Sequence, residues 1–145
     1  MVKEFTVLGE PKGKGRPRFN PKICGSKPRT PEQTLVYENL IGWEYRRQCN
    51  GCFPEKVPVV MEITAYYSIP ASAGKKKRSL MECGEERPVK KPDLDNVVKV
   101  YADALNQLAY HDDSQIVTII CKKYYSDRPR VAVRLSDMGG DNEIR

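Results

Sequence analysis

Two kinds of hydrophobic periodicity follow one another along the chain, and their order limits the folds that it can adopt. Alternating apolar and polar residues predict strands at 5–8, 59–69, 115–125 and 130–135. Apolar residues at helical spacing predict helices at 30–48 and 93–106. This order predicts an α+β domain, in which a small mixed sheet of about four strands packs against two helices.

The starts of the two predicted helices carry capping residues. Thr30 suits the N-cap of the first helix, with Pro31 as its first helical residue and Gln33 as the reciprocal partner. Asp93 suits the N-cap of the second helix, where Asp95 complements the helix dipole. The apolar stripes of both helices are expected to be core. They comprise Val36, Tyr37, Leu40, Ile41, Trp43 and Tyr45 in the first helix, and Leu94, Val97, Val98, Tyr101, Leu105 and Leu108 in the second.

The remaining segments are predicted to be loops of one domain spanning 1–145, because 145 residues is the length of an ordinary domain. Pro, Gly and basic residues fill 11–29 and polar residues fill 70–92, so both are expected to be basic loops. The polar tail is expected to fray from Ser136. Without a signal sequence or a long apolar run, the expected location is the cytoplasm, with no membrane partner.

Positive charge is concentrated in the first of these loops. The chain has 25 Lys and Arg against 19 Asp and Glu, and 11–29 alone holds seven of the basic residues and no acidic one. Removing those seven leaves 18 basic residues against 19 acidic ones, so the rest of the chain is almost neutral. Such a local excess is typical of a surface that binds nucleic acid, although a solvated loop has the same composition.

Acidic residues gather at two places around the second predicted helix. Asp95, Lys99 and Asp103 recur at four-residue spacing, which places them on one helix face. A surface ion ladder has the same spacing, and Asp93 alone would serve as a helix cap. A second acidic pair follows at 112–113, in the link to the next strand.

Clustered carboxylates in a basic protein favour a magnesium site. Mg²⁺ prefers carboxylate oxygens and completes its octahedron with water and substrate phosphate oxygens. We infer that the aspartates hold metal and that the neighbouring Lys90 and Lys91 hold phosphate. A helix carries the chain about 1.5 Å per residue away from its start. Asp113 therefore meets Asp93 only if the link doubles back along the helix, or else a second subunit completes the site.

Other metal and nucleophile sites fit the sequence less well. An EF-hand loop that starts at Asp93 needs an oxygen ligand at Val97 and a glycine at Val98. His111 is the only histidine and no nucleophile elbow is present, so a hydrolytic triad is not supported. A C-x-x-C begins at Cys49, but the second ligand pair of a zinc site is missing and free thiols are expected. A sugar-nucleotide enzyme with a D-x-D motif would need a larger nucleotide-binding α/β domain than this chain can supply, so no nucleotide cofactor is expected.

The acidic pattern resembles that of the RusA family of Holliday junction resolvases. That family has D-L-D-N, a lysine four residues after the second Asp, a D-A-L further along the helix, and a D-D pair before a strand. This chain has DLDN at 93–96, Lys99, DAL at 103–105 and DD at 112–113. GKGRPRF and TPEQTLVYE also resemble the amino-terminal region of many members, so the resemblance covers nearly the whole chain. The insertion SAGKKKRSLMECGEERPVKK departs from the shortest members.

The resemblance implies a dimeric endonuclease, of a kind found in bacteria and their prophages, that cleaves four-way DNA junctions by paired symmetric nicks with Mg²⁺. Mn²⁺ is an alternative ion. It further implies that Asp93, Asp95 and Asp113 bind the metal, that Lys99 is essential for catalysis and that Asp112 supports the cluster. The DNA contacts expected from charge are Lys12, Lys14, Arg16, Arg18, Lys75, Lys76, Lys77, Arg78, Lys90 and Lys91.

We assign Asp103 to holding Lys99, which would neutralise charge that develops at the phosphate during cleavage. A homodimer is expected because the two opposed strands of a twofold symmetric junction require two sites, and either the second helix or an edge strand would form the interface. The alternatives are a metal-dependent nuclease for other branched DNA, and a non-catalytic DNA-binding module whose aspartates only cap a helix.

Overall fold

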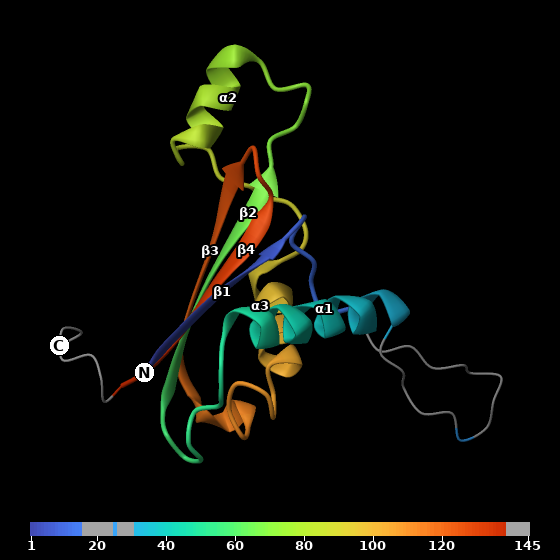
Figure 1. Ribbon diagram of the computed structural model, residues 1–145. Helices are drawn as coiled ribbons and strands as arrows, with labels where there is room; N and C mark the ends of the chain where they lie inside the picture. Colours follow the sequence, from blue (N-terminus) through green and yellow to red (C-terminus); the bar gives the residue numbers. More distant parts are fainter. Residues whose placement is uncertain (16–24, 26–30, 139–145) are drawn as a thin grey trace.

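The computed structural model describes residues 1–15, 25 and 31–138 (Figure 1). Within these ranges the predicted α+β fold is confirmed, with four strands that form one mixed sheet. The elements in chain order are β1 (Val2–Leu8), α1 (Glu32–Gln48), β2 (Val59–Ser68), α2 (Lys75–Glu82), α3 (Leu94–Ala104), the 3-10 turn η1 (Asp113–Gln115), β3 (Ile116–Ser126) and β4 (Arg130–Asp137).

The sheet has the strand order β1-β4-β2-β3, so β1 and β3 lie at its two edges. β4 pairs antiparallel with both β1 and β2, whereas β2 and β3 are parallel. Parallel neighbours need a crossover connection, and here that connection contains α2, α3 and η1. The whole acidic region predicted from the sequence therefore lies in one crossover between two paired strands.

The hydrophobic core lies between one face of the sheet and the helices α1 and α3 (Figure 1). Tyrosines join the layers. The rings of Phe5 in β1 and Tyr45 in α1 meet edge to face at 5.6 Å between centroids. Tyr37 in α1 and Tyr101 in α3 meet in the same way, and their hydroxyl oxygens are 2.7 Å apart. This buried contact fixes the distance between the two helices.

The predicted core stripe of the first helix was wrong in part. Tyr37, Ile41 and Tyr45 are buried, but Val36, Leu40 and Trp43 are 62%, 40% and 60% exposed. The reason is that α1 packs mainly on β1 and α3, so a single narrow side of the helix is covered. Its start also differs from the expectation, because Pro31 takes the N-cap position and Thr30 lies outside the described residues.

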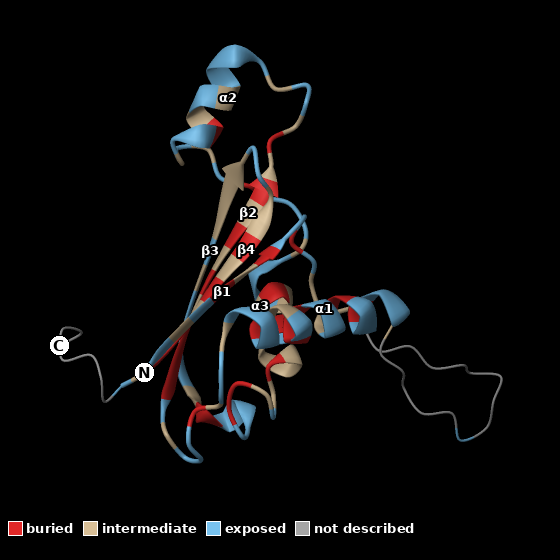
Figure 2. Cartoon of the chain, in the orientation of Figure 1, coloured by how far each residue is buried: buried red, intermediate tan, exposed pale blue. Residues whose placement is uncertain are grey.

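The loop predicted at 70–92 contains the helix α2, so that prediction was wrong over Lys75–Glu82. Lys, Arg, Leu and Met are strong helix formers, and the buried side chain of Met81 anchors the helix. Its other residues are largely exposed, as Figure 2 shows, which explains why no apolar period predicted it.

The carboxyl-terminal tail begins later than expected. Ser136 and Asp137 belong to β4, and Ser136 is buried between its partners Val2 and Val60 in the neighbouring strands. Ser136 remains in the strand, although it is polar, because it pairs with residues of both neighbouring strands. The tail from residue 139 lies outside the described residues. None of the helices in the described ranges has the length and apolar character needed to cross a bilayer.

Candidate active site

The start of α3 presents two carboxylates to solvent. Asp93 is the N-cap residue, as predicted, but its side chain makes no capping hydrogen bond. Asp95 lies in the first turn, and both residues are exposed. Since a capping aspartate normally accepts a bond from the N2 or N3 amide, the carboxylate of Asp93 remains available for another ligand.

The backbone before Asp93 is held by two strands of the sheet. The hydroxyl group of Tyr67 in β2 donates to the carbonyl oxygen of Pro92 at 2.6 Å. The ammonium group of Lys123 in β3 donates to the carbonyl oxygen of Lys90 at 2.5 Å. Burial raises the pKa of Tyr67, and the nearby charges of Cys121 and Asp93 add to that increase. Tyr67 and Lys123 therefore fix the backbone immediately before Asp93 to the sheet.

A hollow of about 950 Å³ is lined in part by Asp93. It is lined by Pro11, Lys12, Gly13, Lys14, Gly15, Pro31, Gln33, Thr34, Tyr37, Lys91, Pro92, Asp93 and Asn96. One wall is the segment 12–15, which is bonded to both helices. The amide of Lys14 donates to the carbonyl oxygen of Asn96 at 3.0 Å, and the amide of Gly15 donates to the hydroxyl oxygen of Thr34 at 3.0 Å.

Gly13 allows this wall to approach α3 closely. A Cβ atom at Gly13 would lie 2.9 Å from the Cβ atoms of both Pro92 and Asn96. We expect Gly13→Ala to lower the free energy of unfolding by about 1–3 kcal/mol, because overpacking of this size forces the wall away from the helix. Urea unfolding measures the change. Gly74→Ala is the control, since nothing lies within 4 Å of a Cβ atom there, and equal losses in both variants would contradict close packing at Gly13.

Lys14 lies in an ion cluster within this wall. Its ammonium group pairs with Glu38 of α1 and lies 3.3 Å from the Oδ2 atom of Asp103 in α3. Burial acts to lower the pKa of Lys14, but the two carboxylates outweigh it and raise the pKa overall. The prediction that Asp103 holds Lys99 is therefore wrong, because Asp103 pairs with Lys14. Lys14, predicted to contact phosphate, links three segments in the structure, and its contact with DNA stays a prediction.

Lys99 lies one turn after Asp95 on the exposed side of α3. In the part of the chain that the structure describes, no carboxylate lies within ion-pair distance of it. Its ammonium group and the Asp95 carboxylate are thus presented on the same helix face, as the four-residue spacing predicted.

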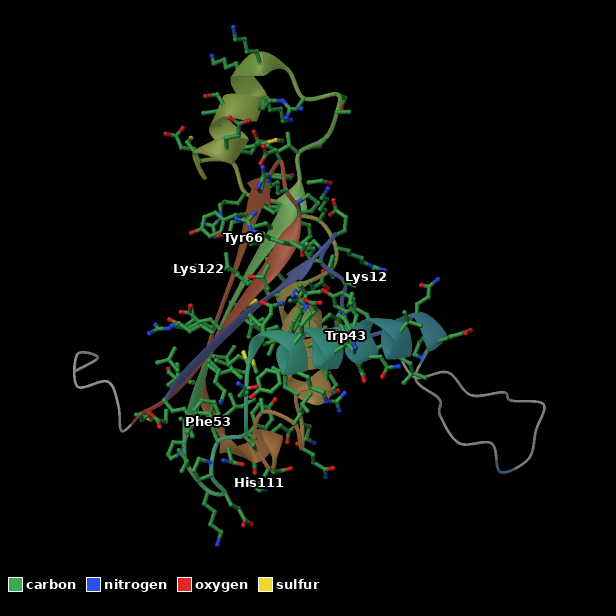
Figure 3. The ribbon with its side chains drawn as sticks, in the orientation of Figure 1. Lys12, Trp43, Phe53, Tyr66, His111 and Lys122 are labelled. Atoms are coloured by element: carbon green, nitrogen blue, oxygen red, sulfur yellow. The ribbon has the colours of Figure 1, made fainter. Side chains whose placement is uncertain are left out.

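The second acidic pair lies at the other end of α3. The hydroxyl group of Tyr110 donates to the carbonyl oxygen of Ala102 at 2.6 Å, which folds the link against the last turns of the helix. Burial raises the pKa of Tyr110, and the charge of Asp113 adds to it. Figure 3 labels Lys12 and His111 at opposite ends of α3. The 11 residues of α3 span about 16 Å, and the bond from Tyr110 to Ala102 holds the link at the end of the helix away from Asp93.

The side chain of Asp112 caps the turn η1. Its carboxylate accepts a hydrogen bond from the amide of Ser114 at 3.2 Å and another from the Ser114 hydroxyl group. These bonds hold the pKa of Asp112 below its usual range. The Gln115 side chain completes a capping box and also donates to the carbonyl oxygens of Pro54 and Val57, which fixes η1 to the chain before β2. Asp113 is left exposed at the start of this turn.

Among the described residues, no three His, Cys, Asp or Glu side chains lie close enough to hold a metal ion. The pairs Asp93–Asp95 and Asp112–Asp113 therefore do not form one cluster within a single chain. Cys49, the start of the C-x-x-C, is a free thiol, and its pKa is raised by burial.

Apart from Lys14, the predicted DNA-binding residues that the structure describes fall into three groups. Lys12 and Lys91 line the hollow and are exposed. The basic residues 75–78 lie on α2, at the end of the sheet opposite η1 (Figure 1), where Lys77 pairs with Glu86 at 3.7 Å. Lys90 is exposed beside Tyr125. Arg16 and Arg18 lie outside the described residues.

The sequence did not identify three uncharged residues that position the site, namely Gly13, Thr34 and Tyr67. The glycines of the KGKG segment were interpreted only as loop formers, and their close approach to α3 is a property of the fold. Tyr67 lies in the strand predicted at 59–69, and its bond to Pro92 joins residues that are 25 positions apart.

Comparison with known proteins gives one family and two relatives. The family model described as Endodeoxyribonuclease RusA matches residues 9–136. The chain is 39% identical over 143 residues to "Uncharacterized protein YqaN" of Bacillus subtilis (strain 168), a match that covers 93% of this chain and 96% of that protein. It is 32% identical over 88 residues to "Crossover junction endodeoxyribonuclease rusA" of Lactococcus phage r1t, covering 60% of each chain.

Proposed function

Because the chain belongs to the RusA family of endodeoxyribonucleases, we propose that it resolves Holliday junctions by paired nicks in opposed strands during DNA recombination. The phage relative, named a crossover junction endodeoxyribonuclease, supports this substrate. The chain is an endodeoxyribonuclease, so the alternative of a non-catalytic DNA-binding module is set aside. The observation that carries the proposal is the pair of exposed carboxylates, Asp93 and Asp95, at the start of α3, where Asp93 lines a hollow together with two exposed lysines.

Asp93 and Asp95 suit a divalent ion, and Mg²⁺ in particular. Their carboxylates are hard ligands, and the side chain of Asp93 is not used as a helix cap. Mg²⁺ is commonly bound by one or two carboxylates together with substrate phosphates, and a pair of this kind satisfies that requirement. When bound, such an ion lowers the pKa of a coordinated water and stabilises the attacking and leaving oxygens of an in-line displacement.

The other residues at this end of α3 would bind and orient the phosphodiester. Lys12 and Lys91 would attract the DNA backbone into the hollow. Lys99 projects from the same helix face as Asp95, so its ammonium group would neutralise charge that develops on the scissile phosphate. Lys14, Glu38 and Asp103 would act indirectly, because their ion cluster holds the wall of the hollow against both helices.

Asp113 would complete the metal site from a second subunit. It lies at the far end of α3 from Asp93, so one chain presents each half of the acidic set at a different place. A twofold dimer in which the two α3 helices run antiparallel would bring each Asp93–Asp95 pair toward an Asp113 of the other copy. Two such composite sites would suit the two opposed strands of a four-way junction.

The substrate is tested by comparing a four-way junction with a flap, a fork and a linear duplex that share one sequence. Each strand is labelled in turn, and products are mapped with Mg²⁺, with Mn²⁺ and without a divalent ion. Paired nicks in opposed strands of the junction alone would support resolution. Faster cutting of the flap or the fork would instead support the nuclease for other branched DNA.

We expect Lys12→Gln together with Lys91→Gln to weaken junction binding and to reduce its salt dependence. Each lost phosphate contact reduces the slope of log K against log salt by about 0.9 for duplex DNA. Titrations at several salt concentrations without divalent ion measure the slope. Arg46→Gln is the control, because Arg46 is exposed at the other end of α1. An unchanged slope in the double variant would remove both lysines from the DNA surface.

A further inference from the structure

A segment between α2 and α3 is bonded to the sheet. This strap, residues 87–92, belongs to the link that connects the two helices, which lie well apart along the sheet (Figure 1). The Nε atom of Arg87 donates to the carbonyl oxygen of Lys123 at 2.5 Å, and the Arg87 guanidinium group lies 3.8 Å from the centre of the Tyr124 ring. Both partners belong to the edge strand β3, so the start of the strap is held there.

Lys123 and Tyr67 hold the rest of the strap. The ammonium group of Lys123 donates to the carbonyl oxygen of Lys90 and lies 4.9 Å from the centre of the Tyr67 ring. The hydroxyl group of Tyr67 donates to the carbonyl oxygen of Pro92. Tyr67 is buried in β2, which pairs with β3. Two adjoining side chains of the sheet therefore fix the last residues of the strap, directly before Asp93.

The position of the Asp93 carboxylate depends on the end of this strap. Asp93 is the N-cap residue, with an extended backbone at φ −70° and ψ 156°, and its side chain makes no capping bond. Its carbonyl oxygen enters the helix, where it accepts from the amide of Val97 at 3.0 Å. The peptide group that joins Pro92 to Asp93 lies outside the helix. The bond from Tyr67 fixes that peptide group, and with it the Cα atom from which the Asp93 side chain leaves the backbone.

We propose that Tyr67 and Lys123 are positioning residues for the Asp93–Asp95 pair, a role that rests on the metal site of the proposed function. They act through the backbone of the strap rather than by contact with the ion. A ligand that is already held in place loses less conformational freedom when an ion binds. Groups that orient metal ligands in this way raise the metal affinity by about 10–100-fold.

Two tyrosine variants separate this role from a general loss of stability. Tyr67→Phe keeps the buried ring and removes only the hydroxyl group that bonds to Pro92. Tyr45→Phe is the matched control, because the buried Tyr45 makes the same kind of bond, at 2.5 Å, to the carbonyl oxygen of Gly51 in the link between α1 and β2. Each variant loses one hydroxyl–carbonyl bond, but only Tyr67→Phe releases the strap.

Tryptic cleavage of the metal-free protein measures how firmly the strap is held. Within the strap, trypsin can cut only after Lys90, because a proline follows both Arg87 and Lys91. Cleavage of a locally opened segment follows the population of the open form, so we expect Tyr67→Phe to be cut faster at Lys90 than the wild-type protein. Tyr45→Phe should be cut there at the wild-type rate. An unchanged rate in Tyr67→Phe, or equal increases in both variants, would overturn the inference.

Direct binding of Mn²⁺ tests the consequence for the ligands, without reference to cleavage. The electron paramagnetic resonance signal of free Mn²⁺ gives the affinity, and binding at this site is the part that Asp95→Asn removes. We expect Tyr67→Phe to bind Mn²⁺ about tenfold more weakly than the wild-type protein, and Tyr45→Phe to match the wild-type affinity. A wild-type affinity in Tyr67→Phe would overturn the inference alone. A wild-type protein that binds no Mn²⁺ would overturn it together with the proposed metal site.

The sign of the effect at Lys123 separates positioning from charge. Lys123→Met keeps the length of the side chain but removes its bond to Lys90. Loss of a positive charge alone would strengthen the binding of a cation, whereas release of the strap would weaken it. We therefore expect weaker Mn²⁺ binding by Lys123→Met. The control Lys122→Met should not weaken binding, since Lys122 lies on the side of the sheet away from α1 and α3 (Figure 3). Stronger binding by Lys123→Met would overturn its positioning role.

Discussion

Asp95→Asn is expected to abolish junction cleavage while it leaves junction binding intact. The amide keeps the size of the side chain but removes the negative charge and one hard oxygen ligand. Loss of an ion that stabilises transition-state charge costs several kcal/mol, which corresponds to a rate decrease of at least about 10³-fold. Single-turnover cleavage with Mg²⁺ measures the rate, and a gel-shift titration without divalent ion measures binding.

The matched control is Asp127→Asn, which removes an exposed carboxylate in the turn between β3 and β4. It should cut at the wild-type rate. Continued cutting by Asp95→Asn would remove that residue from the metal site. Loss of binding together with cutting would mean that Asp95 acts in DNA recognition or in folding.

The fold was largely predictable because the strands β1, β2 and β4 and two of the helices bury a regular set of side chains. β2 alternates buried and partly exposed residues from Met61 onward, as its sequence pattern indicated. α3 buries Val97 and Tyr101 at the expected four-residue spacing. The helix α2 was missed because only Met81 is buried in it, so no apolar period marks it.

The site was predictable only where chemistry follows from local spacing. Asp95 and Lys99 share a helix face because four residues make about one turn. The separation of Asp93 from Asp113 depends on long-range contacts, such as that of Gln115 with the carbonyl oxygens of Pro54 and Val57. Composition also could not show that two nearby lysines differ in their surroundings. Lys14 pairs with carboxylates from two helices, whereas Lys12 is exposed.

Mixing Asp95→Asn with Asp113→Asn is expected to restore cutting that neither variant has alone. If each site combines Asp95 of one subunit with Asp113 of the other, the mixed dimer has one site with both carboxylates and one site with neither. Such a dimer should nick one strand of a junction without the paired nick in the opposed strand. Recovery from nearly zero would be the largest relative change expected for this protein.

The control for this experiment is a mixture of Asp93→Asn with Asp95→Asn. Both changes lie in the same half-site at the start of α3, so every site in the mixed dimer lacks one ligand and cutting should stay lost. Native mass spectrometry must first show that the subunits have exchanged. Recovery in the first mixture but not in the control requires that Asp95 and Asp113 act together from different chains. No recovery after proven exchange would mean that the two half-sites do not combine across the dimer, and Asp113 would then lose its proposed role as a metal ligand.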